Sequence, residues 1–190
     1  MKTKSIYFVT GNKGKFVEAQ KKLYELGLEV IQKDLGYPEI QAIKLEDVAL
    51  YGAEYIQKQT SHPFILEDAG LFIDVFKGFP GVYSAYVFHT IGCDGVLKLM
   101  KNIKVKDRKA VFRSVFAYGK PGCKPHLFIG ECKGVISILK RGNNGFGYDP
   151  IFIPQNSNKT FAEMSVYEKN SYSHRGKSLE KLIDFFKKCY

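Results

Sequence analysis

The stretch Ile6-Tyr7-Phe8-Val9-Thr10-Gly11-Asn12-Lys13-Gly14-Lys15 decides the fold, because it leads from a predicted strand into a predicted helix. The two glycines let the backbone approach a ligand closely, and the free N–H groups at a helix start attract anions. Two lysines and a threonine hydroxyl add further donors. The Walker pattern GxxxxGK[ST] is absent. The stretch therefore indicates a phosphate-binding turn, with a capped turn that binds no ligand as the alternative.

The composition indicates one globular domain with excess positive charge. The chain has 190 residues, 45% of them hydrophobic, and Lys+Arg exceed Asp+Glu by 29 − 19 = 10. Such a balance favours an anionic partner: a nucleotide, a nucleic acid or a membrane surface. No apolar run is long enough for a signal peptide or a membrane span, so we expect a cytoplasmic protein. The cysteines form no CxxC motif, which favours ordinary reduced thiols.

Hydrophobic patterning predicts early alternation of strands and helices, followed by a long hairpin. This order favours an α/β fold, with a mixed sheet flanked by helices in a single domain covering residues 1–190. The predicted strands are Ile6–Thr10, Leu28–Gln32, Phe64–Glu67, Lys109–Tyr118, Leu127–Leu139 and Ile151–Ile153. The predicted helices are Lys15–Leu26, Glu46–Gln59, Ile91–Lys101 and Ser178–Lys188.

A second candidate segment is Leu66-Glu67-Asp68-Ala69-Gly70-Leu71, in which two acids directly follow an apolar strand. Neighbouring side chains of a strand point to opposite faces, so the two acids are expected to have different roles. An acid at a strand end of an α/β protein lies where ligands usually bind. Carboxylates together with phosphates suit Mg²⁺. The alternative is a solvated turn.

Two further segments carry polar and aromatic side chains in loops. The glycine-rich segment 141–150 holds Phe146, which can stack on a ring, and Asp149, which can accept ring N–H groups. Its alternative is a flexible loop. The segment 168–177 gathers hydrogen-bond donors just before the last predicted helix. There the alternatives are a packed or capping histidine at position 174 and a surface arginine at position 175.

These four segments, in this order, resemble the inosine triphosphate pyrophosphatase family, also called the non-standard purine NTP pyrophosphatases. The resemblance runs from TGNKGK to SHRGKSLEKL and includes LEDAGLFIDVFKGFPGVYSAYV, FGYDPIFIP and FAEMSVYEKN. It implies an elongated, twisted mixed sheet, two lobes around a deep substrate cleft, and a homodimer. It also implies Mg²⁺-dependent hydrolysis of ITP, dITP and XTP to the monophosphate and pyrophosphate, which removes deaminated purines before a polymerase uses them.

The resemblance implies a role for each matching residue. Asp68 falls on the catalytic acid, described as a general base that also contacts the metal, and Glu39 falls on a metal-binding acid. Ala69 stands where many members have serine or threonine, which weakens any hydroxyl role there. The other substrate-binding residues that it implies are Thr10, Gly11, Asn12, Lys13, Gly14 and Lys15 in the phosphate turn, Phe146, Gly147, Tyr148 and Asp149 in the base pocket, and Lys169, His174 and Arg175.

Two other functions remain open. One is a pyrophosphatase for other altered nucleotides, such as modified pyrimidines. The other is a non-catalytic nucleic-acid-binding domain, which the net charge of +10 and the many Tyr and Phe residues support. No recognised binding motif accompanies that charge, so we expect neither a nucleic-acid nor a membrane partner. Tyr83, Tyr86 and Phe88 suit core packing or a dimer interface.

Overall fold

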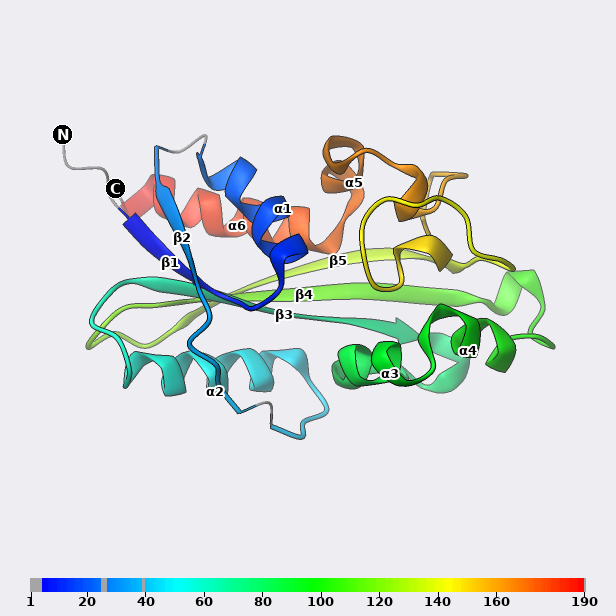
Figure 1. The fold of residues 1–190 in the computed structure, drawn as a ribbon, viewed down its shortest axis with the longest axis horizontal. Coiled ribbons are helices and arrows are strands. Elements are labelled where there is room, and N and C mark those ends of the chain that lie inside the picture. The colour runs from blue at the N-terminus through cyan, green and yellow to red at the C-terminus, as the bar shows by residue number, and fades with distance from the viewer. Residues whose placement is uncertain (1–4, 25–26, 39, 190) are drawn as a thin grey trace.

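A computed structural model describes residues 5–24, 27–38 and 40–189 of the chain (Figure 1). Its described part contains one six-stranded sheet in the order β2-β1-β3-β4-β5-β6. β1 is parallel to β2 and β3, whereas the neighbours from β3 to β6 are antiparallel. The predicted mixed α/β sheet is therefore confirmed. The strands are β1 (Ser5–Val9), β2 (Glu29–Lys33), β3 (Phe64–Ile73), β4 (Lys109–Gly119), β5 (His126–Ile136) and β6 (Phe152–Pro154).

Helices cover both faces of this sheet. In Figure 1, α1, α5 and α6 lie above the sheet, and α2, α3 and α4 lie below it. The helices are α1 (Lys13–Tyr24), α2 (Leu45–Gln57), α3 (Ser84–Thr90), α4 (Gly92–Leu99), α5 (Val166–Tyr172) and α6 (His174–Cys189). Short 3₁₀ turns are η1 (Asp74–Phe76), η2 (Gly81–Tyr83), η3 (Val105–Asp107), η4 (Asp149–Ile151) and η5 (Phe161–Glu163).

Three hydrophobic clusters divide the molecule into two lobes. One cluster lies between the sheet and the helices α1 and α6, and includes Phe8 and Phe116. A second lies on the opposite face against α2, and includes Leu66 and Val115. These two make the first lobe. A third cluster, around Phe112, fills the second lobe beside α4 and β6. Strands that are buried on both faces explain why β1 and the start of β3 are almost continuously apolar.

The prediction that the third strand ends at Glu67 is wrong, since β3 continues to Ile73. β1 accompanies β3 only as far as the pair Val9–Leu66, whereas β4 pairs with the whole of β3 and sets Asp68 opposite Val115. Asp68 therefore lies within a strand, at the point where the neighbouring parallel strand stops. The antiparallel partner, which local patterning did not connect to β3, extends the strand past the two acids.

Helix boundaries also differ from the prediction. α1 begins at Lys13, its predicted end at Leu26 lies outside the described residues, and α6 begins at His174, four residues before the predicted start. The prediction missed α3 and α5. The hydroxyl of Ser165 accepts from the N–H of Glu168, so the Ser-x-x-Glu pattern was a readable start signal for α5. The short α3 lacks such a signal.

Two simpler expectations concern membranes and cysteines. No helix in the described part of the chain is long and apolar enough to span a membrane. Cys93, Cys123 and Cys132 are free thiols, as predicted, and the side chain at position 189 lies outside the description.

Arg108 joins three segments of the second lobe. Its side chain is 3% exposed and donates to the backbone carbonyls of Met100, Ile136 and Ser137 at 2.6–2.8 Å. These carbonyls follow α4 and end β5. A buried carbonyl that loses its donor costs free energy, so Arg108 fixes where these chain segments meet.

Replacing Arg108 by Met keeps an apolar stem but leaves those carbonyls without the guanidinium. We expect the free energy of unfolding to fall by about 3 kcal/mol. Urea titration followed by circular dichroism measures it. Lys106→Met, in the exposed turn η3, is the matched control and should change it by less than about 0.5 kcal/mol. Equal effects of the two substitutions would contradict the structural role of Arg108.

Candidate active site

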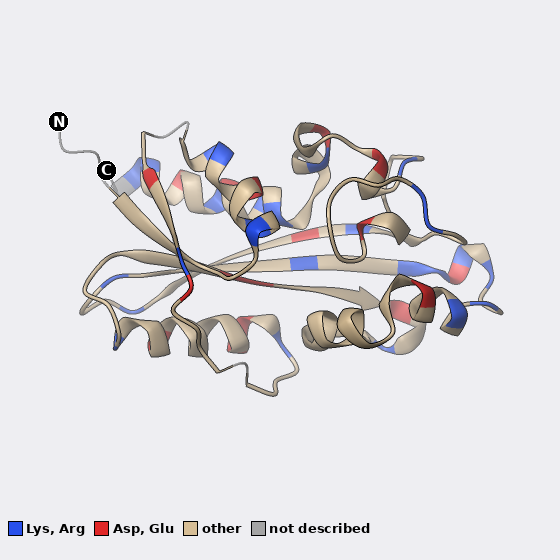
Figure 2. Ribbon diagram, viewed as in Figure 1, with Lys and Arg blue, Asp and Glu red and all other residues tan. Residues whose placement is uncertain are grey.

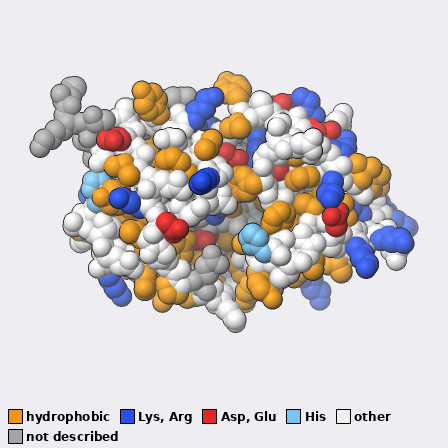
Figure 3. Space-filling model, viewed as in Figure 1, with side chains coloured by type: hydrophobic (Ala, Val, Ile, Leu, Met, Phe, Trp, Pro, Cys, Tyr) orange, Lys and Arg blue, Asp and Glu red, His pale blue; other side chains and the backbone are white. Residues whose placement is uncertain are grey.

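A pocket of about 310 Å³ opens between the two lobes. In the space-filling view of Figure 3 the surface is hollowed near the middle, where the lobes meet. Residues far apart in the chain line this pocket, which is within the usual size range of small-molecule sites. The predicted substrate residues in its wall are Asn12, Lys15, Ala69, Phe146, Gly147, Tyr148, Asp149, Lys169, His174 and Arg175.

The remaining predicted residues lie outside this lining. Thr10 and Asn12 cap the turn, because Thr10 Oγ1 accepts from the N–H of Asn12 and Asn12 Oδ1 accepts from the N–H of Lys15. Lys13 is exposed in the first turn of α1. Glu39, the predicted metal ligand, lies outside the described residues. Thr10, Gly11, Lys13, Gly14 and Asp68 are not among the lining residues, although each lies within two residues in the chain of Asn12, Lys15 or Ala69, which are.

A buried ionic network forms the floor of the pocket. Lys169 Nζ, on α5, lies 2.7 Å from both Glu18 Oε1 and Asp149 Oδ2. Arg175, in the first turn of α6, donates to Glu18 and places its Nε 3.0 Å from Glu67 Oε1. Both cations and their three carboxylates are at most 5% exposed. The network therefore ties α1, β3, α5 and α6 together.

Lys15 completes this network from the phosphate turn. Its Nζ lies 3.0 Å from Glu67 Oε2 and donates to the backbone carbonyl of Glu67 at 2.8 Å. Three cations then meet three carboxylates, 3 − 3 = 0, so the network is electrically balanced. Buried charges are tolerated when paired in this way. Lys15, Lys169 and Arg175 consequently bring little free positive charge to an anionic ligand.

The pKa values follow from this pairing. Burial by itself would raise the pKa of Glu67, but the opposing charges of Arg175 and Lys15 hold it well below its ordinary value. Glu18 has a lowered pKa for the same reason, through Arg175 and Lys169. For Asp149 burial prevails over the charge of Lys169, and its pKa is raised.

His174 stands apart from the ionic pairs. Its ring stacks on Phe112 with the centroids 4.6 Å apart, and it is 3% exposed. Burial, reinforced by the charge of Arg175, lowers the pKa of His174 well below its ordinary value, so the imidazole is neutral. Its Nδ1 has no hydrogen-bond partner in the described part of the chain. A buried polar atom without a partner in a pocket wall suits a ligand contact.

Phe146 and Asp149 already contact other residues of the protein. Lys169 Nζ lies 4.9 Å from the centre of the Phe146 ring, and Arg175 lies 5.3 Å from it. A Cβ at Gly14 would come within 2.6 Å of this ring, so the glycine makes room for it. Asp149 Oδ2 accepts from Lys169 and from the N–H of Phe146. Stacking of Phe146 on a base therefore stays a prediction, and Asp149 offers a base its other oxygen.

The two neighbouring acids of β3 lie on opposite faces, as the strand period predicts. Glu67 faces α1 and α6 and belongs to the ionic network. Asp68 is half-buried on the other face, where its Oδ2 accepts from the hydroxyl of Tyr37 at 3.0 Å. Two consecutive residues of β3 thus belong to different environments on the two faces of the sheet.

Beyond Leu66, β1 no longer pairs with β3. From Leu71 onward the same edge is covered by Ser84 and by Phe79, whose backbone carbonyl accepts from the N–H of Ile73. The stretch around Ala69 is the part that remains accessible to a ligand. Lys15 binds the carbonyl of Glu67 on this edge, and the N–H of Leu71 on the same edge donates to Ser84 Oγ. Ala69 lies between them, so its backbone N–H faces the same edge by strand alternation. Alanine at position 69 lacks the side-chain hydroxyl of serine or threonine, but its backbone N–H is still available as a donor.

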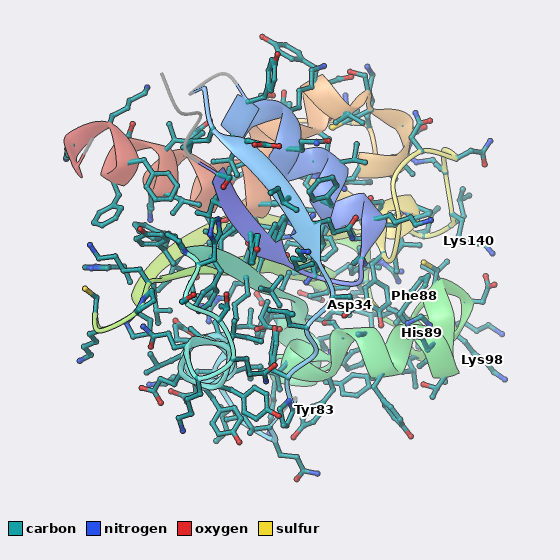
Figure 4. All side chains as sticks on the ribbon, turned by 60° about the vertical axis from the view of Figure 1, so that its left-hand side comes forward. Asp34, Tyr83, Phe88, His89, Lys98 and Lys140 are labelled. Carbon is teal, nitrogen blue, oxygen red and sulfur yellow. The ribbon has the colours of Figure 1, made fainter. Side chains whose placement is uncertain are left out.

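Sequence reasoning missed several residues of the site. Glu18 follows Lys15 by three residues on α1, so helical spacing already placed both on one face. Phe88 and His89 line the pocket from α3, which was not predicted as a helix. Figure 4 shows both on the side of α3 that faces the start of α1 and the loop carrying Lys140. Phe112 comes from the middle of β4, where nothing in the sequence marks it.

The metal prediction rests on carboxylates. No group of three or more His, Cys, Asp or Glu side chains in the described ranges is arranged to hold a metal ion. Mg²⁺ needs only one or two protein carboxylates when phosphates supply other oxygens. Asp68, half-buried beside the open edge of β3, fits such a site.

Substituting Glu67 by Gln removes a carboxylate whose pKa is lowered by folding. Such a group stabilises the fold above its unfolded pKa near 4.5, and this contribution is lost as the pH falls toward the folded pKa. We expect Glu67→Gln to cost about 3 kcal/mol at pH 7. The difference from the wild type should shrink below pH 4.5 by up to about 1.4 kcal/mol per pH unit.

Urea unfolding of both proteins between pH 3 and pH 7 measures this difference. Glu131→Gln is the matched control, because Glu131 pairs with Arg113 at the surface. A difference between wild type and Glu67→Gln that stays constant over this pH range would contradict the ionic network.

Comparison with known proteins identifies the chain's relatives. A sequence model of the Ham1 family matches residues 6–185. The dITP/XTP pyrophosphatase of Methanopyrus kandleri is 50% identical over 182 residues, 96% of each chain. The protein of that name from Thermococcus kodakarensis is 51% identical over 180 residues, 95% of this chain and 96% of the relative.

Solved structures agree with this assignment. The Ham1 protein of Staphylococcus aureus superposes with a TM-score of 0.85 at 29% identity, covering 98% of this chain and 100% of that one. A HAM1 protein from Coxiella burnetii gives a TM-score of 0.84 at 31% identity, covering 97% and 98%. Sequence and fold together place this chain in the Ham1 family.

Proposed function

We propose that this chain is a nucleoside triphosphate pyrophosphatase that hydrolyses ITP, dITP and XTP to the monophosphate and pyrophosphate. By doing so it would keep deaminated purines out of DNA and RNA. One observation carries this proposal: the pocket joins a helix start that suits phosphates to a recess with aromatic walls and a neutral histidine. The relatives named dITP/XTP pyrophosphatase, which cover nearly the whole chain, support it.

The phosphate end would lie between the start of α1 and the open edge of β3. Lys15 and Asn12 line the pocket there, and the exposed Lys13 adds a second cation from the same turn. The α1 N-terminus and the N–H of Ala69 add backbone donors. Lys15, Lys169 and Arg175 are already paired with carboxylates. Lys13 and the helix start would therefore neutralise a larger share of the triphosphate charge.

Asp68 would act on the attacking water. Its carboxylate lies on β3 directly before Ala69, the residue whose backbone N–H faces the exposed strand edge. In the proposed step, a water oxygen attacks the α-phosphorus, Asp68 orients the water and accepts a proton, and pyrophosphate leaves. Positioning and charge stabilisation supply most of the rate in phosphoryl chemistry. A Mg²⁺ ion held by Asp68 and Glu39 would supply positive charge to the phosphate oxygens.

Base selection would occur around His174 and the 146–149 loop. Hypoxanthine and xanthine carry an acceptor oxygen at position 6, whereas adenine carries an amino donor. Guanine shares this oxygen, so rejecting GTP would require a site with no room or no partner for its 2-amino group. His174 can offer its unpaired ring nitrogen, and Arg175 uses only three of its five N–H donors on Glu18 and Glu67. A site that relies on such bonds can discriminate by up to roughly 10⁴-fold.

Assembly and location belong to the same proposal. Tyr83 and Tyr86 are 45% and 71% exposed on η2 and α3, which suits a homodimer interface better than core packing. A cytoplasmic location would place the protein with the nucleotides that polymerases use. A nucleic-acid-binding function is less well supported, because Lys and Arg occur in both layers of the fold rather than along one stripe (Figure 2).

An assay with Mg²⁺ and ITP, XTP, dITP, GTP, ATP, dTTP and modified pyrimidine triphosphates tests this function. We expect pyrophosphate and monophosphate from ITP, XTP and dITP only. Asp68→Asn should lower kcat by about 10²- to 10⁴-fold, since it removes the proton acceptor. Asp74→Asn is the matched control, an exposed acid beyond the end of β3. Orthophosphate in place of pyrophosphate, or no release from any purine, would refute the proposal.

Removal of divalent metal tests the cofactor separately. With EDTA in excess we expect pyrophosphate release to fall at least about 100-fold, and Mg²⁺ added beyond the chelator should restore it. The free energy of unfolding should change little, because the buried carboxylates are paired with cations of the chain itself. Full activity in EDTA would exclude the proposed Mg²⁺ requirement.

A further inference from the structure

Tyr37 contacts Asp68 from a different segment of the chain. It lies in the connection between β2 and α2, and its hydroxyl lies 3.0 Å from Asp68 Oδ2 on β3. A tyrosine hydroxyl that donates to a carboxylate makes a charge-assisted hydrogen bond, which is stronger than a neutral one. The contact links residues 31 positions apart, so it depends on the tertiary fold.

The ring of Tyr37 is itself held in place. It packs against the hydrophobic cluster between β3 and α2, which includes Leu66 and Ala49. A Cβ at Gly52, on α2, would lie 2.7 Å from Cε2 of the ring and 3.1 Å from the ring carbon that bears the hydroxyl. The absence of a side chain at Gly52 therefore makes room for the ring, and packing against helix α2 sets the position of the hydroxyl.

Asp68 is the side chain that gains from this support. The buried neighbour Glu67 is bound by Arg175, Lys15 and Ser114. Asp68 is half-buried beside an edge of β3 that β1 has left, and the Tyr37 hydroxyl is one of the groups that contact it. The terminal torsion of an aspartate is broad, so each donor that binds one of its oxygens narrows the range of carboxylate orientations. The Tyr37 hydroxyl, which donates to Oδ2, therefore restricts the orientation of the Asp68 carboxylate.

We infer that Tyr37 is a positioning residue, which holds the Asp68 carboxylate in the orientation that the reaction requires. The inference rests on the proposed function, in which Asp68 acts on the attacking water. It adds a residue that acts through Asp68. It also gives Gly52 a reason to be glycine in the middle of a helix, where an alanine would normally be preferred.

Tyr37→Phe tests the hydroxyl, because the ring and its packing against Gly52 are kept. We expect kcat for ITP to fall about 10- to 100-fold, the effect of losing one hydrogen bond to a charged group, with KM changed less than about threefold. The urea midpoint should stay near that of the wild type. Tyr51→Phe, on α2 and 39% exposed, is the matched control and should leave kcat unchanged.

Gly52→Ala tests the packing of the Tyr37 ring against α2 without removing the hydroxyl. The new Cβ would push the ring away from its position, so kcat should fall while KM changes less than about threefold. Unchanged kcat in both Tyr37→Phe and Gly52→Ala, with an active wild type, would overturn the positioning role and leave the proposed function standing.

Crystal structures of the wild type and Tyr37→Phe give a readout that needs no activity. We expect one Asp68 orientation in the wild type, and a rotated or multiple-conformer carboxylate in the variant. An Asp68 carboxylate that is unmoved in Tyr37→Phe would overturn the inference even if kcat fell. If the wild type hydrolyses no nucleotide, the proposed function fails, and these two structures still decide whether Tyr37 orients Asp68.

Discussion

The paired contact of Arg175 with Glu18 and Glu67 is the interaction on which the rest of the site depends. It joins the first turn of α6 to α1 and to the middle of β3, in a place that is almost closed to water. Buried charges are costly unless they are matched, so each member needs the others to stay in position. Lys15 and Lys169 extend the same network to the phosphate turn and to the 146–149 loop. The network therefore fixes the side-chain positions of the pocket floor through contacts between four elements.

Because β1 ends early, a stretch of β3 next to the ionic network has no parallel strand beside it. β3 continues past Leu66 without a parallel partner, while β4 supports it on the other side. Glu67 then turns inward as a structural ion, and Asp68 turns outward toward Tyr37 and the loop before α2. One strand thus separates a residue that holds the fold from a residue that suits chemistry. The edge between them presents backbone groups on which a phosphate can rest.

Much of this arrangement could be predicted from the sequence. The apolar run before Thr10 and the helical spacing after Lys15 indicated the β1–α1 turn, and the structure has it. The four motif segments indicated the family and ten residues that do line the pocket. The length of β3 and the start of α6 were not predicted, since both depend on partners distant in sequence. β4 extends β3 past two acids, and α6 begins early because Ser173 Oγ accepts from the N–H of Gly176.

The sequence by itself determined the order of the strands and of the helices α1, α2, α4 and α6, the family and the identity of the acids, because local hydrophobic periods and motif spacing are properties of short segments. Only the tertiary structure decided which charges are free and which are paired. Lys169 and Arg175 read as substrate cations in the sequence, yet each is neutralised by carboxylates from other elements. Tyr37 was likewise unmarked until the fold brought its hydroxyl to Asp68. Charge pairing and burial depend on distances in space, and a short stretch of chain does not contain them.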